Sequence, residues 1–66
     1  MKFTKEGYYR IVGKWMQKKR AERRLKLSDI ASFLGCDEST VGKYEKGTRH
    51  ISLYNFMRLK DYFAEN

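Results

Sequence analysis

The side chains that carry most of the chemistry in this 66-residue chain are its cations, and they are unevenly placed. Fifteen Lys and Arg stand against eight Asp and Glu, which gives a net charge of +7. Between Lys14 and Lys26 there are seven basic residues and one acid, Glu22. Such a run is often only the solvated face of a helix, but a strongly basic surface on so short a chain favours a polyanionic partner, with nucleic acid first. The composition therefore favours contacts with phosphate groups.

A second group of useful side chains lies between residues 38 and 46, which the pattern predicts as a short helix. Val41 and Tyr44, three residues apart, define its inner face. The exposed positions are then Glu38, Ser39, Thr40, Gly42, Lys43 and Lys46. Lys donates to guanine N7 and O6, a carboxylate accepts from cytosine N4, and a Thr methyl group meets a thymine methyl group. This set is suited to reading base edges.

Catalytic and metal-binding patterns are not recognisable in the sequence. The single Cys36 cannot form an internal disulfide, and its position suits a small buried residue, so a structural thiol is preferred to a redox sensor. With one Cys and one His, His50, a zinc site cannot be assembled. No nucleophile–base set or pair of carboxylates is apparent. We therefore expect no enzyme activity, no metal and no cofactor.

The helix over 38–46 is predicted to follow a first short helix over 27–34 across a tight turn. Gly35 supplies the left-handed residue that ends the first of these helices, and Asp37 caps the second. Gly47 ends the second helix in the same way as Gly35 ends the first. The residues expected on the facing surfaces of the pair are Ile30, Ala31, Leu34, Cys36, Val41 and Tyr44.

Two more helices are predicted to flank this pair. Thr4 caps a long first helix that continues to about Arg24, although a glycine such as Gly13 costs roughly 1 kcal/mol there against Ala. Ser52 caps a last helix that runs to about Ala64. The apolar stripes are Tyr8, Ile11, Val12, Trp15 and Met16 in the first helix and Leu53, Phe56, Leu59 and Phe63 in the last. We expect an all-α fold of four helices.

The order and spacing of these residues resemble the Cro/repressor-type helix-turn-helix domains of lambdoid phages and related bacterial regulators. The resemblance extends from about Gly13 to Phe63, and its matching positions are Met16, Arg20, Ile30, Ala31, Leu34, Gly35, Ser39, Thr40, Val41, Tyr44, Glu45, Lys46, Gly47, Ser52, Leu53, Phe56, Leu59 and Phe63. Lys26, Leu27 and Ile51 stand where that family commonly has a capping Ser or Thr, a phosphate-binding Gln and a Pro. The resemblance implies a compact four-helix domain of the lambda repressor-like DNA-binding fold, here with a long first helix.

The resemblance further implies that the helix over 38–46 enters the major groove of DNA. The expected base contacts are Glu38, Ser39, Thr40 and Lys43. The expected phosphate contacts are Lys26, Ser28, Gly42, Lys46, Thr48, Arg49 and His50. Simpler explanations stay open for four of these residues. Glu38 also suits the helix dipole, and Ser39 could act through backbone contacts alone. Lys43 could hold only phosphate, and Gly42 could approach DNA or the preceding helix or be a tolerated weak point.

Arg20 and Glu45 are expected to form a structural ion pair between the first and third helices, as pairs at these positions often do in the family. An unpaired buried Glu would cost several kcal/mol, which favours the pair over the alternative in which Arg20 contacts phosphate.

Together these features predict a sequence-specific regulator of transcription that binds double-stranded DNA, as a homodimeric repressor on a palindromic operator. Residues 13–66 form the DNA-binding domain, and residues 1–12 extend the first helix, pair with a second subunit or form an arm. The alternative is a protein-interaction module, such as an anti-repressor, antitoxin or inhibitor. The aromatic side chains in excess of a small core suit either function: Phe3, Tyr8, Tyr9, Phe33, Tyr54 and Tyr62. No membrane-length apolar run or signal-peptide core is present, so we expect a cytoplasmic protein of bacterial or phage origin, associated with the nucleoid when bound.

Overall fold

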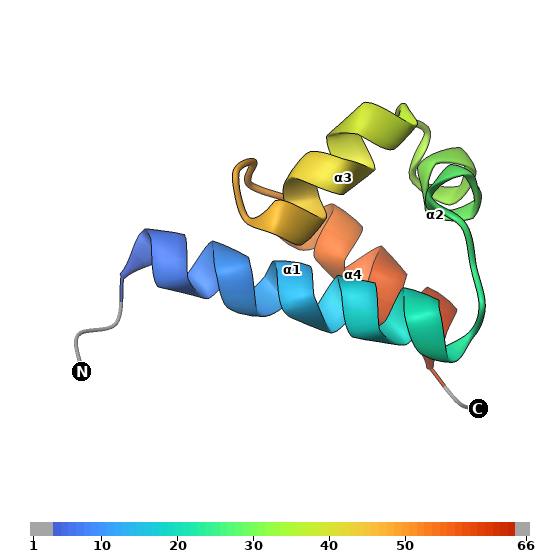
Figure 1. Ribbon diagram of the computed structural model, residues 1–66, viewed down its shortest axis with the longest axis horizontal. Coiled ribbons are helices and arrows are strands. Elements are labelled where there is room, and N and C mark those ends of the chain that lie inside the picture. Colours follow the sequence, from blue (N-terminus) through green and yellow to red (C-terminus); the bar gives the residue numbers. More distant parts are fainter. Residues whose placement is uncertain (1–3, 65–66) are drawn as a thin grey trace.

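Four helices form the described part of the chain, residues 4–64 of a computed structural model. They are α1 (Lys5–Glu22), α2 (Leu27–Leu34), α3 (Glu38–Lys46) and α4 (Leu53–Phe63). α1 runs along the length of the molecule with α4 behind it and α3 above it (Figure 1). α2 lies next to the beginning of α3, at the end of α3 that is away from α1. Residues 4–64 contain no strand, so the predicted all-α, four-helix fold is confirmed. Of these helices none is both long enough and apolar enough to cross a membrane. Phe3 lies outside the described residues.

The helices begin at the side-chain caps that the sequence predicts, with one exception. Thr4, Asp37 and Ser52 each accept a hydrogen bond from the backbone N–H three residues later, at 2.9, 2.8 and 3.1 Å. α2 differs because the ammonium group of Lys26 has no lone pair with which to accept a bond. The Asp29 carboxylate instead accepts from the Lys26 backbone N–H at 2.8 Å, which is the reciprocal half of a capping box.

The helix ends agree with the prediction for α2 and α3 and correct it for α1. Gly35 and Gly47 have φ angles of 77° and 76°, the left-handed conformation that glycine adopts without strain. α1 ends at Glu22, whereas the sequence suggested a helix to about Arg24. Arg24 has a φ of 55°, and a left-handed residue cannot continue a right-handed helix, so the chain turns there.

The core forms where the inner faces of the helices meet, and its buried apolar residues are Val12, Met16, Ile30, Ala31, Val41, Ile51, Leu59 and Phe63. Leu34, Cys36 and Tyr44 are partly buried against it. Leu53 was expected on the inner face of α4 but is 69% exposed. It lies six residues before buried Leu59, which at 3.6 residues per turn rotates it about 120° away.

Gly13 is buried at the crossing of α1 and α3. A Cβ atom there would lie 2.4 Å from the backbone oxygen of Tyr44 and 2.5 Å from that of Glu45, both inside van der Waals contact. The two helix backbones could not approach this closely with any larger residue. The glycine that was expected to weaken the first helix therefore sits in an unbroken helix and permits its packing against α3.

Candidate nucleic-acid interface

α3 is fixed on one side and open on the other. Val41 is fully buried, and Tyr44 packs against the core. On the other side the exposed residues are Glu38, Ser39, Lys43 and Lys46, with Thr40 and Gly42 half-buried beside them. The predicted base-contacting residues thus all lie on one helix, and three of the four are exposed.

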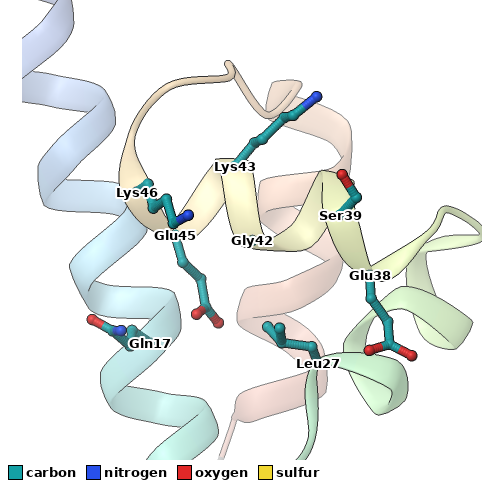
Figure 2. A pocket seen from close by; sticks show the side chains of 8 residues that line it. All are labelled: Gln17, Leu27, Glu38, Ser39, Gly42, Lys43, Glu45 and Lys46. Carbon is teal, nitrogen blue, oxygen red and sulfur yellow. The ribbon is translucent and has the colours of Figure 1, made fainter.

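This side of α3 borders a groove of about 430 Å³ that also reaches α1 and the start of α2 (Figure 2). Its lining residues are Gln17, Leu27, Glu38, Ser39, Gly42, Lys43, Glu45 and Lys46. In Figure 2, Glu45 points from α3 toward α1, while Lys43 extends from the opposite side of α3. A ligand that follows the open side of α3 therefore also meets α1 and the beginning of α2.

Gln17 is a lining residue that the sequence did not single out. It lies four residues after Gly13, one turn further along the side of α1 that faces α3. Its side chain is exposed, and its amide can both donate and accept hydrogen bonds. The spacing from Gly13 was the available signal, but it becomes informative only once Gly13 is known to pack against α3.

Gly42 is open toward the groove. Beyond the neighbouring backbone of α3 itself, a Cβ atom at this position would meet no atom of residues 4–64 within 4 Å, so packing within the domain does not require glycine here. This excludes the interpretation in which Gly42 permits close approach of α2. Two interpretations remain, close approach of a ligand and a tolerated helix defect.

Arg20 and Glu45 form the expected ion pair, and its geometry is bidentate. The Arg20 Nε donates to Glu45 Oε2 at 2.7 Å, and Nη2 donates to Oε1 at 3.1 Å. Nη1 donates to the Leu25 carbonyl oxygen at 3.2 Å. The Glu45 side chain is only 6% exposed, and its hydrogen bond raises the pKa of Arg20 above the ordinary value. Because three guanidinium N–H groups are occupied, the pair fixes the orientation of α3 on α1 rather than serving as a free phosphate contact.

The loop after α3 rests on the first half of α1. The ring of Tyr9 lies 4.9 Å from the ring of His50, centroid to centroid. A Cβ atom at Gly47 would lie 2.9 Å from Cγ of Arg10 and 3.0 Å from its Cα, so α1 and the loop are in close contact. The N-terminal turns of α1 thus support a loop that holds several of the predicted phosphate contacts.

Thr48 has a structural role within that loop. Its backbone N–H and its hydroxyl group both donate to the Lys43 carbonyl oxygen, at 3.0 and 3.3 Å, and so satisfy the end of α3. A phosphate oxygen needs a donor, so a phosphate contact by the Thr48 hydroxyl requires that this bond be exchanged. Lys46, Arg49 and His50 remain exposed around it.

The start of α2 supplies the remaining predicted phosphate contacts. Lys26 is exposed at the cap position, and Ser28 is half-buried in the first turn. Leu27 lies between them and lines the groove, so this helix end opens toward the same surface as α3. The positive end of a helix favours anions, in addition to the charge of Lys26.

The turn between α2 and α3 holds two groups with shifted pKa values. Hydrogen bonds from Thr40 lower the pKa of the Asp37 carboxyl, which is thus ionised at the helix start. Burial, and then the negative charge of Asp37, raise the pKa of the Cys36 thiol. A raised pKa keeps the thiol protonated and poorly nucleophilic, which agrees with a structural role.

Comparison with known proteins assigns this architecture to a family. The profile of the helix-turn-helix family matches residues 16–64. Two curated relatives, from Pyrococcus horikoshii and Pyrococcus abyssi, are described as candidate HTH-type transcriptional regulatory proteins, and each is 34% identical over 58 residues. These residues are 88% of this chain but 18% of each relative, so the chain spans less than a fifth of their length. No solved structure matches the chain at comparable significance. The chain belongs to the helix-turn-helix family, as its resemblance to Cro/repressor-type domains predicted.

Proposed function

We propose that this chain is the DNA-binding domain of a transcriptional regulator and reads double-stranded DNA through α3. The observation that carries the proposal is the two-sided environment of α3. Its inner side is held by Gly13 and by the Arg20–Glu45 pair, while its outer side presents Glu38 and Lys43 to solvent. A helix that enters the major groove needs this combination of rigid support and exposed polar side chains. The family and the regulatory names of the two relatives support the same function.

Within this proposal, base reading falls to the beginning and middle of α3. Lys43 donates to guanine N7 and O6, and Glu38 accepts from cytosine N4. Ser39 and Thr40 add shorter contacts from the first turn of the helix. Gly42 allows the backbone of the duplex to approach the groove, since its own surroundings do not require a glycine.

Phosphate contacts lie at both ends of this surface. Lys26 and Ser28 with the start of α2 hold one strand. The end of α3 and the loop after it hold the other, through Lys46, Thr48, Arg49 and His50. About five phosphate contacts per subunit give a log–log salt slope near −9 for a dimer on B-DNA. A salt slope of this size accompanies charge neutralisation and is not expected for a domain that binds only a folded protein.

The regulator acts as a homodimeric repressor on a palindromic operator in the cytoplasm. One copy of α3 spans too few base pairs to specify a genomic site, and a twofold dimer doubles the reading surface. Repression requires only that the occupied operator exclude the polymerase. Residues 13–66 are the DNA-binding domain in this proposal, residues 1–12 are its extension, and neither catalysis nor a cofactor is involved.

Selection of bound sequences from a random duplex pool tests the proposal, followed by binding measurements over a salt series. We expect a palindrome whose half-site centres lie about 34 Å apart, and a steep salt slope. In the same measurements Lys43→Ala should weaken binding. Lys60→Ala is its matched control, because it removes the same charge from an exposed position on α4. Absence of an enriched motif, together with a flat salt dependence, would contradict the proposal and favour the protein-interaction alternative.

A further inference from the structure

A second groove, of about 320 Å³, lies between α1 and α4 and is mainly apolar. Its lining residues are Tyr8, Ile11, Val12, Trp15, Phe56 and Lys60. Ile11 is 60% exposed, although it is a large aliphatic residue on a helix. The Trp15 and Phe56 rings, whose centroids lie 5.3 Å apart, are partly buried and form the apolar floor together with Val12. This groove shares no lining residue with the groove beside α3.

The two walls of this groove have the same periodicity. On α1 the lining residues Tyr8, Ile11 and Trp15 are at positions i, i+3 and i+7. On α4 the residues Phe56 and Lys60 continue a row that begins with Leu53, again at i, i+3 and i+7. Parallel rows of this spacing over two helical turns fit an amphipathic helix laid into the groove. The exposed position of Leu53, unexpected from the sequence, lengthens the apolar wall.

The groove faces away from the predicted DNA-reading helix. Gly13 marks the side of α1 that contacts α3, because a Cβ atom there would strike the α3 backbone. Ile11 and Trp15 are each two residues from Gly13, which at 3.6 residues per turn places them about 160° around α1. A ligand in this groove therefore leaves the outer side of α3 accessible.

This placement disfavours a second copy of the chain as the occupant in the DNA-bound state. In a dimer formed through this groove, the twofold axis would lie in the plane of the interface. The face of each subunit opposite the interface would then point in the direction opposite to that of its partner. Two α3 helices carried on the opposite face would then point away from each other. One straight duplex could not contact both of them. The operator dimer proposed above must use another surface.

The charges around the groove indicate the chemistry of its occupant. Of the residues that the structure describes, Lys60 is the single charged one in the lining. On α1 the exposed Lys14 and Lys18 lie three residues after Ile11 and Trp15, on the solvent side of the same wall. Among residues 4–64 no carboxylate lines the groove, so its electrostatic complement is acidic.

We propose that the α1–α4 groove binds an acidic amphipathic helix of a partner protein. Apolar side chains of the partner helix enter between Ile11 and Phe56, and its carboxylates face Lys60, Lys14 and Lys18. The inference goes beyond DNA recognition, and only the simultaneous occupation of groove and DNA rests on the proposed function. Such a helix would connect a DNA-bound domain to another protein without competing for α3.

A peptide-display library of random amphipathic helices tests this, with the whole chain as target and Ile11→Glu as counter-target. The expected peptides carry net negative charge and apolar residues at i, i+3 or i+4, and i+7. Trp15 is the only tryptophan of the chain and lies in the groove, so a recovered peptide should change its fluorescence. Ile11→Glu and Lys60→Glu should each weaken binding at least tenfold, and a Lys-bearing peptide should regain affinity for Lys60→Glu.

Tyr54→Glu is the matched control. Tyr54 is also an exposed apolar residue of α4, but its ring lies 5.5 Å from the Arg58 guanidinium, outside the groove lining. The Tyr54→Glu variant should bind the peptide with the same affinity as the unaltered chain. Peptides that bind Ile11→Glu equally well, or that are basic, would overturn the proposal. Concentration-dependent dimers that Ile11→Glu abolishes, seen by sedimentation, would overturn it in favour of a second copy.

A final measurement separates this inference from the proposed function. Peptide binding is followed on the free chain by Trp15 fluorescence and on the DNA-bound chain by anisotropy of labelled DNA. Unchanged DNA affinity at saturating peptide supports simultaneous occupation, and displacement of DNA overturns it. If the chain binds no DNA at all, the proposed function fails, while fluorescence on the free chain still decides the groove.

Discussion

The two long sides of α1 make an instructive contrast. The side toward α3 has a glycine, Gly13, at the point of closest approach and an ion pair, through Arg20, about two turns later. The side toward α4 has large apolar residues, Ile11 and Trp15, that still leave a groove open to solvent. One contact is defined by backbone geometry and directional bonds, and the other by apolar surface alone. The first can fix the orientation of α3, whereas the second leaves room for a ligand.

The largest loss of stability should follow from adding a side chain on the side of α1 that faces α3. Gly13→Val places atoms where even a Cβ would lie 2.4 Å from the Tyr44 backbone oxygen, so α1 and α3 must separate. The cost should exceed the ~3–5 kcal/mol that the core of so small a domain supplies. We expect loss of the cooperative unfolding transition in circular dichroism. A variant that folds with an unchanged midpoint would contradict the crossing described for α1 and α3.

Gly42→Ala is the matched control for this prediction. It is also a glycine within a helix, but a Cβ there meets no atom within 4 Å. Alanine should therefore stabilise the domain by up to ~1 kcal/mol through helix propensity. If DNA approaches Gly42 closely, the same variant should lose DNA affinity while gaining stability, and a thermal melt with a binding titration separates the two effects.

The next largest effect concerns the ion pair. Arg20→Ala and Glu45→Ala should each destabilise the domain by about 2–4 kcal/mol, because each leaves a partly or largely buried charge without its partner. The double variant should cost less than the sum of the two. Urea unfolding of the three variants completes the cycle. Additive losses below 1 kcal/mol would show that the pair does not hold α3 in place.

If α3 is held rigidly and reads base edges, its exposed side chains should determine which base pairs the domain prefers. Lys43→Ala and Glu38→Ala should relax preference at particular base pairs by about 1–3 kcal/mol each. Arg49→Ala or Lys46→Ala should instead weaken all sequences alike and flatten the salt slope by about one unit. Affinities across a panel of single-base operator variants decide between the two patterns. A uniform loss for Lys43→Ala would assign that residue to phosphate.

Local signals account for what the sequence predicted well. The turn at Gly35 and the cap at Asp37 depend on residues within one helical turn, and both stand as predicted. The bounds of α2 and α3 follow from such signals. The end of α1 was predicted less well, because no proline or glycine marks the left-handed turn at Arg24.

Tertiary relations account for what the sequence could not predict. The need for glycine at position 13 arises from the backbone of Tyr44, on another helix far along the chain. Gln17 was overlooked because a neutral side chain in a basic run gives no signal until the side of α1 that faces α3 is known. Leu53 was misplaced because apolar spacing identifies a stripe but not which edge of it is covered. These errors concern packing between helices, which periodicity alone does not encode.

The smallest predicted effect tests whether the first half of α1, like the part from Gly13 onward, supports α3 and the loop that follows it. The ring of Tyr9 packs at a tilt of 40° against the ring of His50 in the loop after α3, and an aromatic pair contributes about 0.5–1.5 kcal/mol. Tyr9→Ala should therefore loosen the loop and weaken binding to all duplexes by several-fold, with base preferences unchanged. Ile11 lies two residues away, on the side of α1 that lines the α1–α4 groove. Ile11→Ser should leave the free energies of unfolding and of DNA binding within about 0.5 kcal/mol of those of the unaltered chain. Affinity for the selected operator and for a scrambled duplex, at two salt concentrations, distinguishes the outcomes. Equal effects of the two variants would mean that the loop does not depend on α1, and that the contrast between the two sides begins only at Gly13.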